Sequence, residues 1–148
     1  MADTTDNADA RVRASFAKQT IMATIGAKVA SVKRGEVEIV LPFSDKILQQ
    51  HGFIHAGAVA TIADSACGYA ALSVMPDDAA VLTTEFKIHL LSPAKGERLR
   101  AVGRVVRAGR KLVITMGEVF AEEDSASKQV ALITASMMVV ETTTGLKD

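Results

Sequence analysis

The residues best suited to chemistry lie in one short stretch, from Gln49 to Asp64. This stretch places two histidines and two glycines at the start of a long apolar run, and one carboxylate, that of Asp64, inside the run. From Gly57 to Met75 no other residue is charged. An ionised carboxylate is costly to bury alone, so Asp64 is expected to face a cavity, a partner or a substrate.

A helix from Ala56 to Met75 is predicted to carry this carboxylate. The segment is rich in alanine and longer than most strands, and Pro76 ends it. Small residues at spacings of three and four share the face of Asp64, so that a second backbone or a ligand can approach closely. Gly57 and Asp64 lie about 10 Å apart along such a helix, so one chain cannot easily supply both to one site. The spacing therefore favours a partner subunit that supplies one of them.

The composition indicates one soluble globular domain. The chain has 148 residues, of which 49% are hydrophobic and 23% charged, and its formal net charge is +0, so nothing suggests a nucleic-acid partner. Cys67 is the only cysteine, which excludes an internal disulfide and fits a reducing cytoplasm, and we expect it to be a small core residue. No secretory signal or membrane span is recognisable, so we expect a cytoplasmic protein without a membrane partner.

The elements that position the helix are predicted from periodicity. Residues 1–14 are expected to be a disordered tail, 15–142 a single domain and 143–148 a C-terminal tail. A short helix from Ser15 to Gly26 comes first, and then a hairpin over 27–42 that turns at 33–35. A four-stranded antiparallel meander is predicted over 81–91, 98–107, 112–121 and 130–141, with a solvated loop at 122–127. The last strand is apolar on both faces, so we expect it in the middle of the sheet or under a partner.

This plan is α+β, a single sheet that covers one apolar face with the long helix. Its outer face is poorly covered, and apolar patches of that kind mark interfaces, so we expect an oligomer.

The order of elements, with His55-Ala56-Gly57 opening the long helix and Asp64 nine residues after His55, resembles the PaaI-type hotdog-fold acyl-CoA thioesterases. The family pattern Asn-x-x-Gly-x-x-His-Gly-Gly reads here Gln49-x-x-Gly52-x-x-His55-Ala56-Gly57. The likeness covers about 16–141 and includes Ser92-Pro93-Ala94. It implies a hotdog fold, in which an antiparallel sheet of five to six strands wraps around one long central helix. It also implies a homodimer or homotetramer with the active site at the subunit interface, and no cofactor.

The resemblance also gives each motif residue a role. Asp64 corresponds to the catalytic carboxylate, as general base on water or as nucleophile. The N–H of Ala56 at the helix start would polarise the thioester oxygen as in an oxyanion hole, and Gly57 would permit close approach. Gln49 would donate to the carbonyl or hold the water, and His55 would fix the loop or bind near the thioester. Two residues depart from the family pattern. Ala56 replaces the usual Gly. Gln49 replaces the usual Asn, and this replacement points to an aliphatic acyl preference.

Thr83 falls where the family carries a Ser or Thr that orients the water. Strict alternation places its hydroxyl on the strand face opposite Phe86, and Thr84 takes the role if the register slips by one. For both, an ordinary strand threonine is the alternative interpretation.

The basic residues Arg107, Arg110 and Lys111 cluster at a hairpin tip, where family members hold the CoA phosphates. A solvated turn is the alternative for each. His51 and His55, four residues apart, do not make a metal site, because no third ligand is near in the sequence.

The sequence therefore predicts an acyl-CoA thioesterase that acts on medium or long aliphatic acyl chains. Four alternatives stay open: a phenylacetyl-CoA or a hydroxybenzoyl-CoA thioesterase, a hotdog dehydratase of 3-hydroxyacyl thioesters with a histidine base, and a non-catalytic acyl-CoA sensor.

Overall fold

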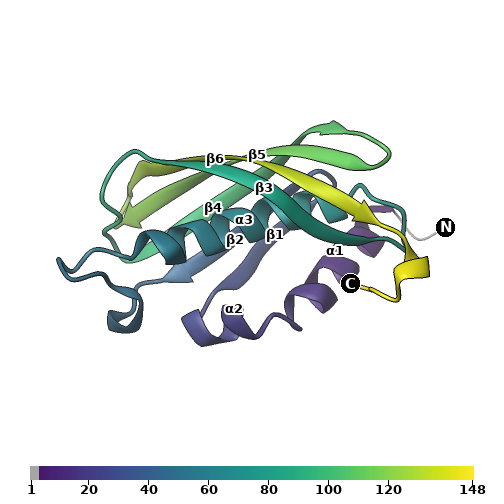
Figure 1. The fold of residues 1–148 in the computed structure, drawn as a ribbon. Coiled ribbons are helices and arrows are strands. Elements are labelled where there is room, and N and C mark those ends of the chain that lie inside the picture. The colour runs from purple at the N-terminus through teal and green to yellow at the C-terminus, as the bar shows by residue number, and fades with distance from the viewer. Residues whose placement is uncertain (1–3) are drawn as a thin grey trace.

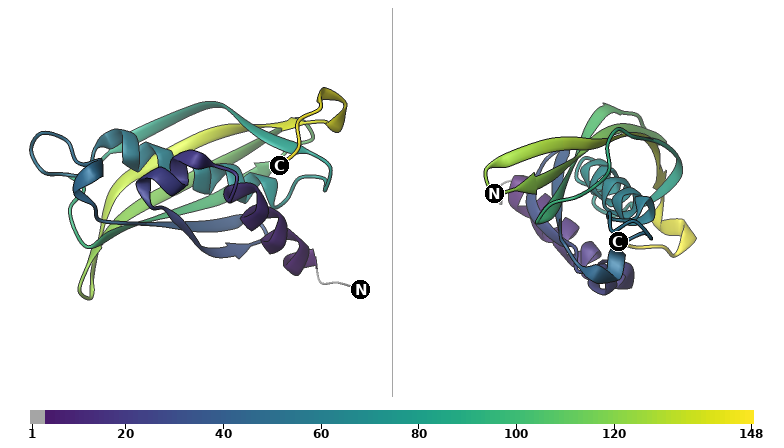
Figure 2. Two further views of the ribbon diagram at one scale, coloured as in Figure 1. Left: turned by 90° about the horizontal axis from the view of Figure 1, so that it is seen from below. Right: turned by 90° about the vertical axis from the view of Figure 1, so that its left-hand side faces the viewer.

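The computed structural model describes residues 4–148, in which a six-stranded antiparallel sheet curls around one long helix, α3 (Ala56–Leu72). Figure 1 shows the sheet over the helix, and the end-on view in Figure 2 shows the helix enclosed by the curve of the sheet. The strand order is β1-β2-β4-β5-β6-β3. The strands are β1 (Lys28–Lys33), β2 (Glu36–Pro42), β3 (Ala80–Leu90), β4 (Arg98–Ala108), β5 (Leu112–Glu123) and β6 (Ala126–Val140). The predicted α+β class and the sheet wrapped around a central helix are confirmed.

The strand order corrects one prediction. β4, β5 and β6 form a meander, but β3 lies at the far edge beside β6 instead of beside β4. β2 already occupies the free side of β4, so the link over residues 91–97 carries the chain from β3 across the end of the sheet. β6 is paired on both sides, which agrees with its apolar character on both faces. Within residues 4–148, β3 therefore has one side without a strand partner.

Two predicted boundaries also move. α3 ends at Leu72, three residues before the predicted end, where Ser73 donates from its hydroxyl to the carbonyl of Ala70 and accepts from the N–H of Gly35. These bonds satisfy the helix end before Pro76 is reached. The predicted loop over 122–127 is a tight turn at Asp124, which has a φ of 52°, so β5 and β6 extend into it.

The N-terminal prediction is wrong for most of its length. Residues 4–14, expected to be disordered, belong to α1 (Thr4–Phe16), while residues 1–3 lie outside the described residues. Ala8 and Val12, one turn apart, bury one face of this helix, and the Arg11 guanidinium donates to the carbonyl of Leu72, the last residue of α3, and to that of Met75. The single predicted helix is therefore two helices, α1 and α2 (Thr20–Ile25), and Gly26 ends the second as predicted.

The C-terminal segment returns to the body of the protein. A short 3-10 turn, η2 (Thr142–Thr144), follows β6, and the Asp148 carboxylate accepts hydrogen bonds from the Ser15 hydroxyl and the Val81 N–H. Asp148 thereby connects α1 to the start of β3.

The central position of α3 depends on two glycines in the sheet. Gly103 of β4 and Gly117 of β5 are cross-strand partners, and both lie against α3 at Cys67. A β-carbon on Gly103 would lie 2.3 Å from the carbonyl carbon of Ala66. The helix thus approaches the sheet at a distance that only glycine permits.

Candidate functional site

Asp64 lies on the part of α3 that the sheet does not cover, and the residue is half-buried. The Thr83 hydroxyl of β3 donates to its Oδ1 across 2.8 Å. Burial raises the pKa of Asp64 above its ordinary value, and the Thr83 hydrogen bond opposes that rise. A carboxylate with a raised pKa and one oriented oxygen is suited to general-base chemistry near neutral pH.

A β-bulge brings Thr83 to this position. Thr83 pairs with Met137, whereas Glu85 pairs with the adjacent Ser136, so the register shifts by one residue at Thr84. As a result Thr83 and Phe86 both face α3, and the prediction that they lie on opposite faces is wrong. Thr84, the alternative candidate, donates instead to the carbonyl of Ser136. No glycine or proline marks the bulge in the sequence, so simple alternation could not reveal it.

At the start of α3, His55 occupies the N-cap position, and its Nδ1 accepts from the N–H of Gly57 across 2.7 Å. A β-carbon on Gly57 would approach this nitrogen to 3.0 Å, which explains the glycine as a close-approach residue. The next N–H groups of the helix, those of Ala58 and Val59, donate to the carbonyl oxygen of His55. Among the hydrogen bonds of residues 4–148, none uses the N–H of Ala56. The free donor at the helix start is therefore Ala56 alone, because the N–H of Gly57 is engaged.

Gln49 shapes the loop that leads into the helix. Its side-chain oxygen accepts from the N–H groups of His51 and Phe53, which leaves its NH₂ group as the side chain's remaining polar group. Gln49 and Ala56 border one apolar cavity of about 440 Å³. The cavity is otherwise lined by Phe53, Ile54, Val59, Leu90, Leu91, Ser92, Pro93, Ala94 and Val130.

The structure does not unite the two halves of the predicted site within one chain. Asp64 and Thr83 border a separate polar cavity of about 100 Å³, and neither Gln49 nor Ala56 lines it. An open groove of about 390 Å³ runs along α3 past Gly57 and Asp64, with Phe86 on one wall. From Ala56 to Asp64 the helix rises about 12 Å, too far for one thioester carbonyl to meet both.

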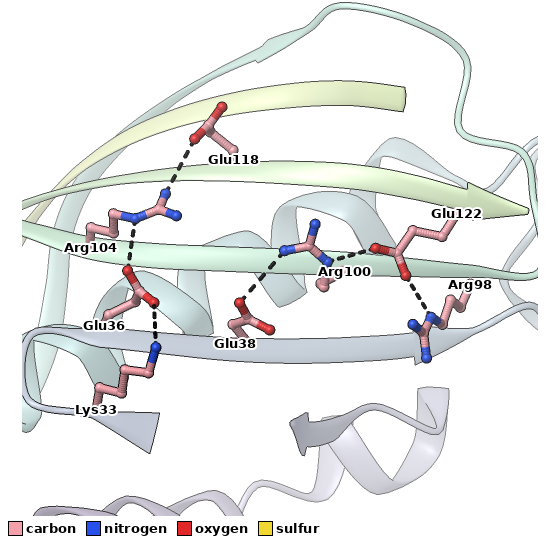
Figure 3. A network of polar contacts seen from close by, with 8 residues as sticks. All are labelled: Lys33, Glu36, Glu38, Arg98, Arg100, Arg104, Glu118 and Glu122. Carbon is pink, nitrogen blue, oxygen red and sulfur yellow. Dashed lines mark hydrogen bonds and ion pairs between the residues drawn. The ribbon is translucent and has the colours of Figure 1, made fainter. Parts of the chain in front are cut away.

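The basic hairpin differs from the other arginines of the sheet. Figure 3 shows Arg98, Arg100 and Arg104 of β4 in ion pairs on the outer face of the sheet. Their partners are Glu36, Glu38, Glu118 and Glu122. Arg107, Arg110 and Lys111 are exposed, and none of the ion pairs within residues 4–148 uses them. These three cations are therefore available to an external anion.

Cys67, one turn beyond Asp64, is a core residue, as predicted. It is fully buried, and burial raises the pKa of its thiol to about 12 despite a hydrogen bond with Thr115. Such a thiol stays protonated at neutral pH and cannot act as a nucleophile.

Three residues near Asp64 were missed by sequence reasoning. Gln19, Ser65 and Tyr69 line the polar cavity beside Asp64, and the Gln19 amide donates to the Tyr69 hydroxyl across 2.7 Å. None belongs to a recognisable motif. Gln19 precedes Asp64 by 45 residues and comes from the turn between α1 and α2, so only the tertiary structure brings it there.

Known proteins resemble this chain in both sequence and structure. A thioesterase family protein from Silicibacter pomeroyi is 45% identical, and the match covers 90% of this chain and 98% of that one with a TM-score of 0.89. The PaaI protein of E. coli, 20% identical over 93% of this chain and 96% of that chain, has the same fold with a TM-score of 0.83. The 1,4-dihydroxy-2-naphthoyl-CoA hydrolase of Listeria monocytogenes is 23% identical over 61% of this chain and 73% of its own length.

The family model of the thioesterase superfamily matches residues 51–128, which include the start of α3, Asp64, Thr83 and the basic hairpin. The match spans more than half of the chain. The resemblance to the hotdog-fold thioesterases is thereby confirmed, and the protein belongs to the thioesterase superfamily as a thioester hydrolase.

Proposed function

We propose that the protein hydrolyses acyl-CoA thioesters, with Asp64 as the general base and the N–H of Ala56 as the oxyanion donor. The observation that carries this proposal is the Thr83–Asp64 hydrogen bond, which orients a carboxylate of raised pKa at the edge of an open groove. Water attacks the carbonyl carbon and gives its proton to Asp64. The carbonyl oxygen becomes an oxyanion that accepts from Ala56. The C–S bond then breaks, and the CoA sulfur takes the proton from Asp64.

The apolar cavity beside Ala56 supports a hydrocarbon acyl group. Aliphatic side chains such as Leu90, Leu91 and Val59 make up most of its wall, which favours medium or long aliphatic chains. An aryl-CoA thioesterase is the second candidate, because Phe53 offers a ring to the same cavity and one relative is a 1,4-dihydroxy-2-naphthoyl-CoA hydrolase.

The remaining alternatives fit the site less well. A dehydratase would use His55 as its base, but Nδ1 of His55 is engaged as the helix cap. A sensor would not need a carboxylate that a threonine hydroxyl orients at the edge of an open groove. Within residues 4–148 no helix is long and apolar enough to cross a membrane. The proposed location is the cytoplasm, and the free, buried Cys67 is compatible with its reducing environment.

A second copy of the chain completes the site. The stripe of α3 that lines the groove contains Gly57, which is exposed, and Ala60, Thr61 and Asp64, which are half-buried. The small side chains of this stripe permit close packing of two helices. A two-fold axis between Ala60 and Thr61 brings Gly57 of one copy opposite Asp64 of the partner subunit. Ala56 then lies beside the partner subunit's Asp64, and each dimer has two complete sites.

The free edge of β3 supports the same axis. Residues 82–87 of this strand are all exposed, and Phe86 lines the groove together with Ala60 and Thr61. Antiparallel pairing of two β3 strands about Phe86 places Glu85 opposite Lys87 of the partner subunit, twice per dimer. One axis thus serves both the helices and the strand edges, and the charge pairs fix the register.

The cations of Arg107, Arg110 and Lys111 are proposed to bind the phosphates of CoA. We expect their replacement by methionine to raise the KM for an acyl-CoA while kcat stays unchanged. The KM for the matching acyl-pantetheine thioester, which lacks the phosphates, is expected to stay constant. Arg98→Met is the matched control, because Arg98 is already paired with Glu122. Equal effects on both thioesters would contradict the assignment.

The oxyanion donor can be removed with little change to the helix. Ala56 is the first helical residue, where proline is favoured, and His55 has φ −60° and ψ 139°, values compatible with a following proline. Ala56→Pro is expected to lower kcat by about 10²–10³-fold. Ala56→Gly, which keeps the N–H, is the control and is expected to stay active. Asp64→Asn is expected to lower kcat by about 10²–10⁴-fold. Thiol release that survives in Asp64→Asn would refute hydrolysis by this site.

Mixing inactive subunits tests the shared site. A heterodimer of Ala56→Pro and Asp64→Asn subunits has one doubly defective site and one intact site. Random exchange at equal concentrations is expected to restore about a quarter of the wild-type activity, since half of the dimers are heterodimers with one of two sites intact. If the mixture stays as inactive as its components after subunit exchange, both groups belong to one chain and the arrangement is wrong.

A further inference from the structure

Gln19 occupies the N-cap position of α2, but its side chain makes no capping hydrogen bond. Instead its Nε2 donates to the Tyr69 hydroxyl across 2.7 Å, and its Oε1 accepts from the Ser65 hydroxyl across 3.4 Å. Both partners are on α3: Ser65 follows Asp64 directly, and Tyr69 is one helical turn after Ser65. Local helix capping therefore does not explain the orientation of Gln19, which is directed toward the site.

Tyr69 holds this amide in place. Because the Tyr69 hydroxyl accepts from Gln19, its own proton is free for the Ser15 hydroxyl 3.3 Å away, and Ser15 in turn donates to Asp148. The Tyr69 ring also packs at 6.0 Å from that of Phe16. The chain of donors runs in one direction, so the Gln19 amide is fixed with one N–H toward Tyr69.

The half-open cavity lined by these residues has the size and polarity of a water site. Its volume is about 100 Å³, and with a water molecule taking about 30 Å³ it has room for about three. Its lining, within the described residues, is Gln19, Asp64, Ser65, Gly68, Tyr69, Val81, Thr83 and Asp148. Six of these carry neutral polar or carboxylate side chains, so a water molecule would find the two to four partners that it needs. A long hydrocarbon chain would find little space there and a lining that is mainly polar.

The hydrogen-bond capacity of the lining is suited to one orientation of water. Thr83 donates to Oδ1 of Asp64, which leaves Oδ2 to accept a proton. Gln19 has two N–H bonds on its amide and uses one of them on Tyr69. A water molecule that accepts from the second N–H of Gln19 and donates to Asp64 keeps one lone pair for attack on a carbonyl carbon.

We propose that Gln19 positions the hydrolytic water, and that the polar cavity between α2, α3 and β3 is the water chamber of the site. This inference rests on the proposed hydrolysis by Asp64. The thioester then approaches from the groove on α3, with its acyl chain in the apolar cavity. The N-terminal helices thereby contribute a group that the motif at the start of α3 does not contain.

Steady-state kinetics of Gln19→Met with an aliphatic acyl-CoA test the proposal. This change keeps the length of the side chain and removes its donors. We expect kcat to fall about 10- to 100-fold, the loss of a well-placed hydrogen bond or two in the transition state, with KM within twofold of wild type. Ser65→Ala is expected to give a smaller loss of the same kind, and it serves if Gln19→Met does not fold. Gln129→Met is the matched control, since Gln129 bonds to Glu118 on the outer face of the sheet.

A second readout responds to proximity and not to fold stability. Gln19→Glu places another carboxylate beside Asp64, in a cavity whose other titratable groups are Asp148 and Tyr69. Because a like charge disfavours ionisation, the acidic limb of the kcat/KM profile is expected to move to higher pH. Gln129→Glu, with the same net charge change, is expected to leave the limb in place.

Three results would overturn the proposal. An unchanged kcat in Gln19→Met and Ser65→Ala means that the water is held elsewhere. A loss that appears only in KM, or only with acyl groups that carry a hydroxyl, means that the cavity receives substrate. An acidic limb that does not move in Gln19→Glu means that the two side chains are apart in solution. Failure of the proposed function itself is distinct, because it would appear as hydrolysis that is insensitive to Asp64→Asn.

Discussion

Replacement of Gly103 by alanine is expected to cost about 3 kcal/mol of stability, at the upper end of the range for overpacking a core. The added β-carbon would lie 2.3 Å from the carbonyl carbon of Ala66 and 2.5 Å from the nitrogen of Cys67. An ordinary contact begins at 3.4 Å, so α3 or β4 must move by about 1 Å. Both obstacles are backbone atoms inside a helix, which cannot rotate away as a side chain would.

The cost is measurable as a melting temperature. For a chain of this size, 3 kcal/mol corresponds to roughly 6–12 °C, compared at one protomer concentration because the protein is proposed to dimerise. Ala66 is two residues from Asp64, so the same movement is expected to disturb the Thr83–Asp64 hydrogen bond. A displacement of about 1 Å at a catalytic group can lower the rate about 10²-fold, so kcat of the folded variant should fall as well.

A comparison with Gly117 separates this explanation from a general intolerance of the sheet. A β-carbon on Gly117 would meet Cys67 Sγ and Ile133 Cγ2, each at 2.9 Å, so its obstacles include a removable side-chain atom. Cys67→Ala should therefore recover about 1 kcal/mol or more of the cost of Gly117→Ala, but little of the cost of Gly103→Ala. A Gly103→Ala variant that melts within 2 °C of wild type, or that Cys67→Ala rescues as fully, would refute the argument.

Four further outcomes are expected. Thr83→Val removes the hydrogen bond that lowers the pKa of Asp64, so the acidic limb of the kcat/KM profile should move to higher pH. Thr83→Ser keeps the hydroxyl and should leave the limb in place. A limb that does not move in Thr83→Val contradicts the role of Thr83 as the hydrogen-bond donor to Asp64. Because burial raises the pKa of Asp64, folding favours its protonated form. The wild type therefore loses stability as the pH rises from the unfolded-state pKa, near 3.8, through the folded-state pKa. Asp64→Asn should show no such loss and should melt at a higher temperature than the wild type above this pH range. Arg100 and Arg98 hold the pKa of Glu122 below its usual 4.5, so the stabilisation from these ion pairs is present above pH 4.5 and is lost on acidification. In a denaturant titration, Glu122→Gln should cost less than about 1 kcal/mol at pH 7 and nothing in acid. Arg11→Met leaves carbonyls at the end of α3 without their donor and should cost about 1–3 kcal/mol by the same titration.

Most elements could be predicted because each shows its own period in the sequence. The hairpin 27–42 and the strands near 98–108 and 112–121 alternate clearly, and the alanine-rich helix is bounded by its motif and Pro76. The position of β3 could not be predicted, because alternation describes the faces of a strand and says nothing of its neighbours. The part of α1 before Ser15 was missed because Ala8 and Val12 are the only buried apolar residues among the described residues there.

The candidate site divides in the same way. The motif indicated Ala56, Gly57 and Asp64 by spacing alone, and Thr83 by resemblance. It could not show which N–H is free, because that depends on the rotamer of His55, whose ring reaches over the first turn to Gly57. It also could not show that Thr83 reaches Asp64, because the bulge at Thr84 has no sequence marker.

The N-terminal helices join the site to the far end of the fold. Arg11 binds α1 to carbonyls at and just after the end of α3, and eight residues later Gln19 binds the start of α2 to Tyr69 in the last turn of α3. The Arg11 and Gln19 hydrogen bonds attach the N-terminal helices to α3 at two separate points. Because α3 also carries Asp64, these two attachments fix the distance between Gln19 and Asp64. If Gln19 positions water, loosening the first attachment in Arg11→Met should lower kcat of the folded protein as well as its stability. If kcat is unchanged, the helices only cover the core, and the activity of the site depends on α3, β3 and the partner subunit alone.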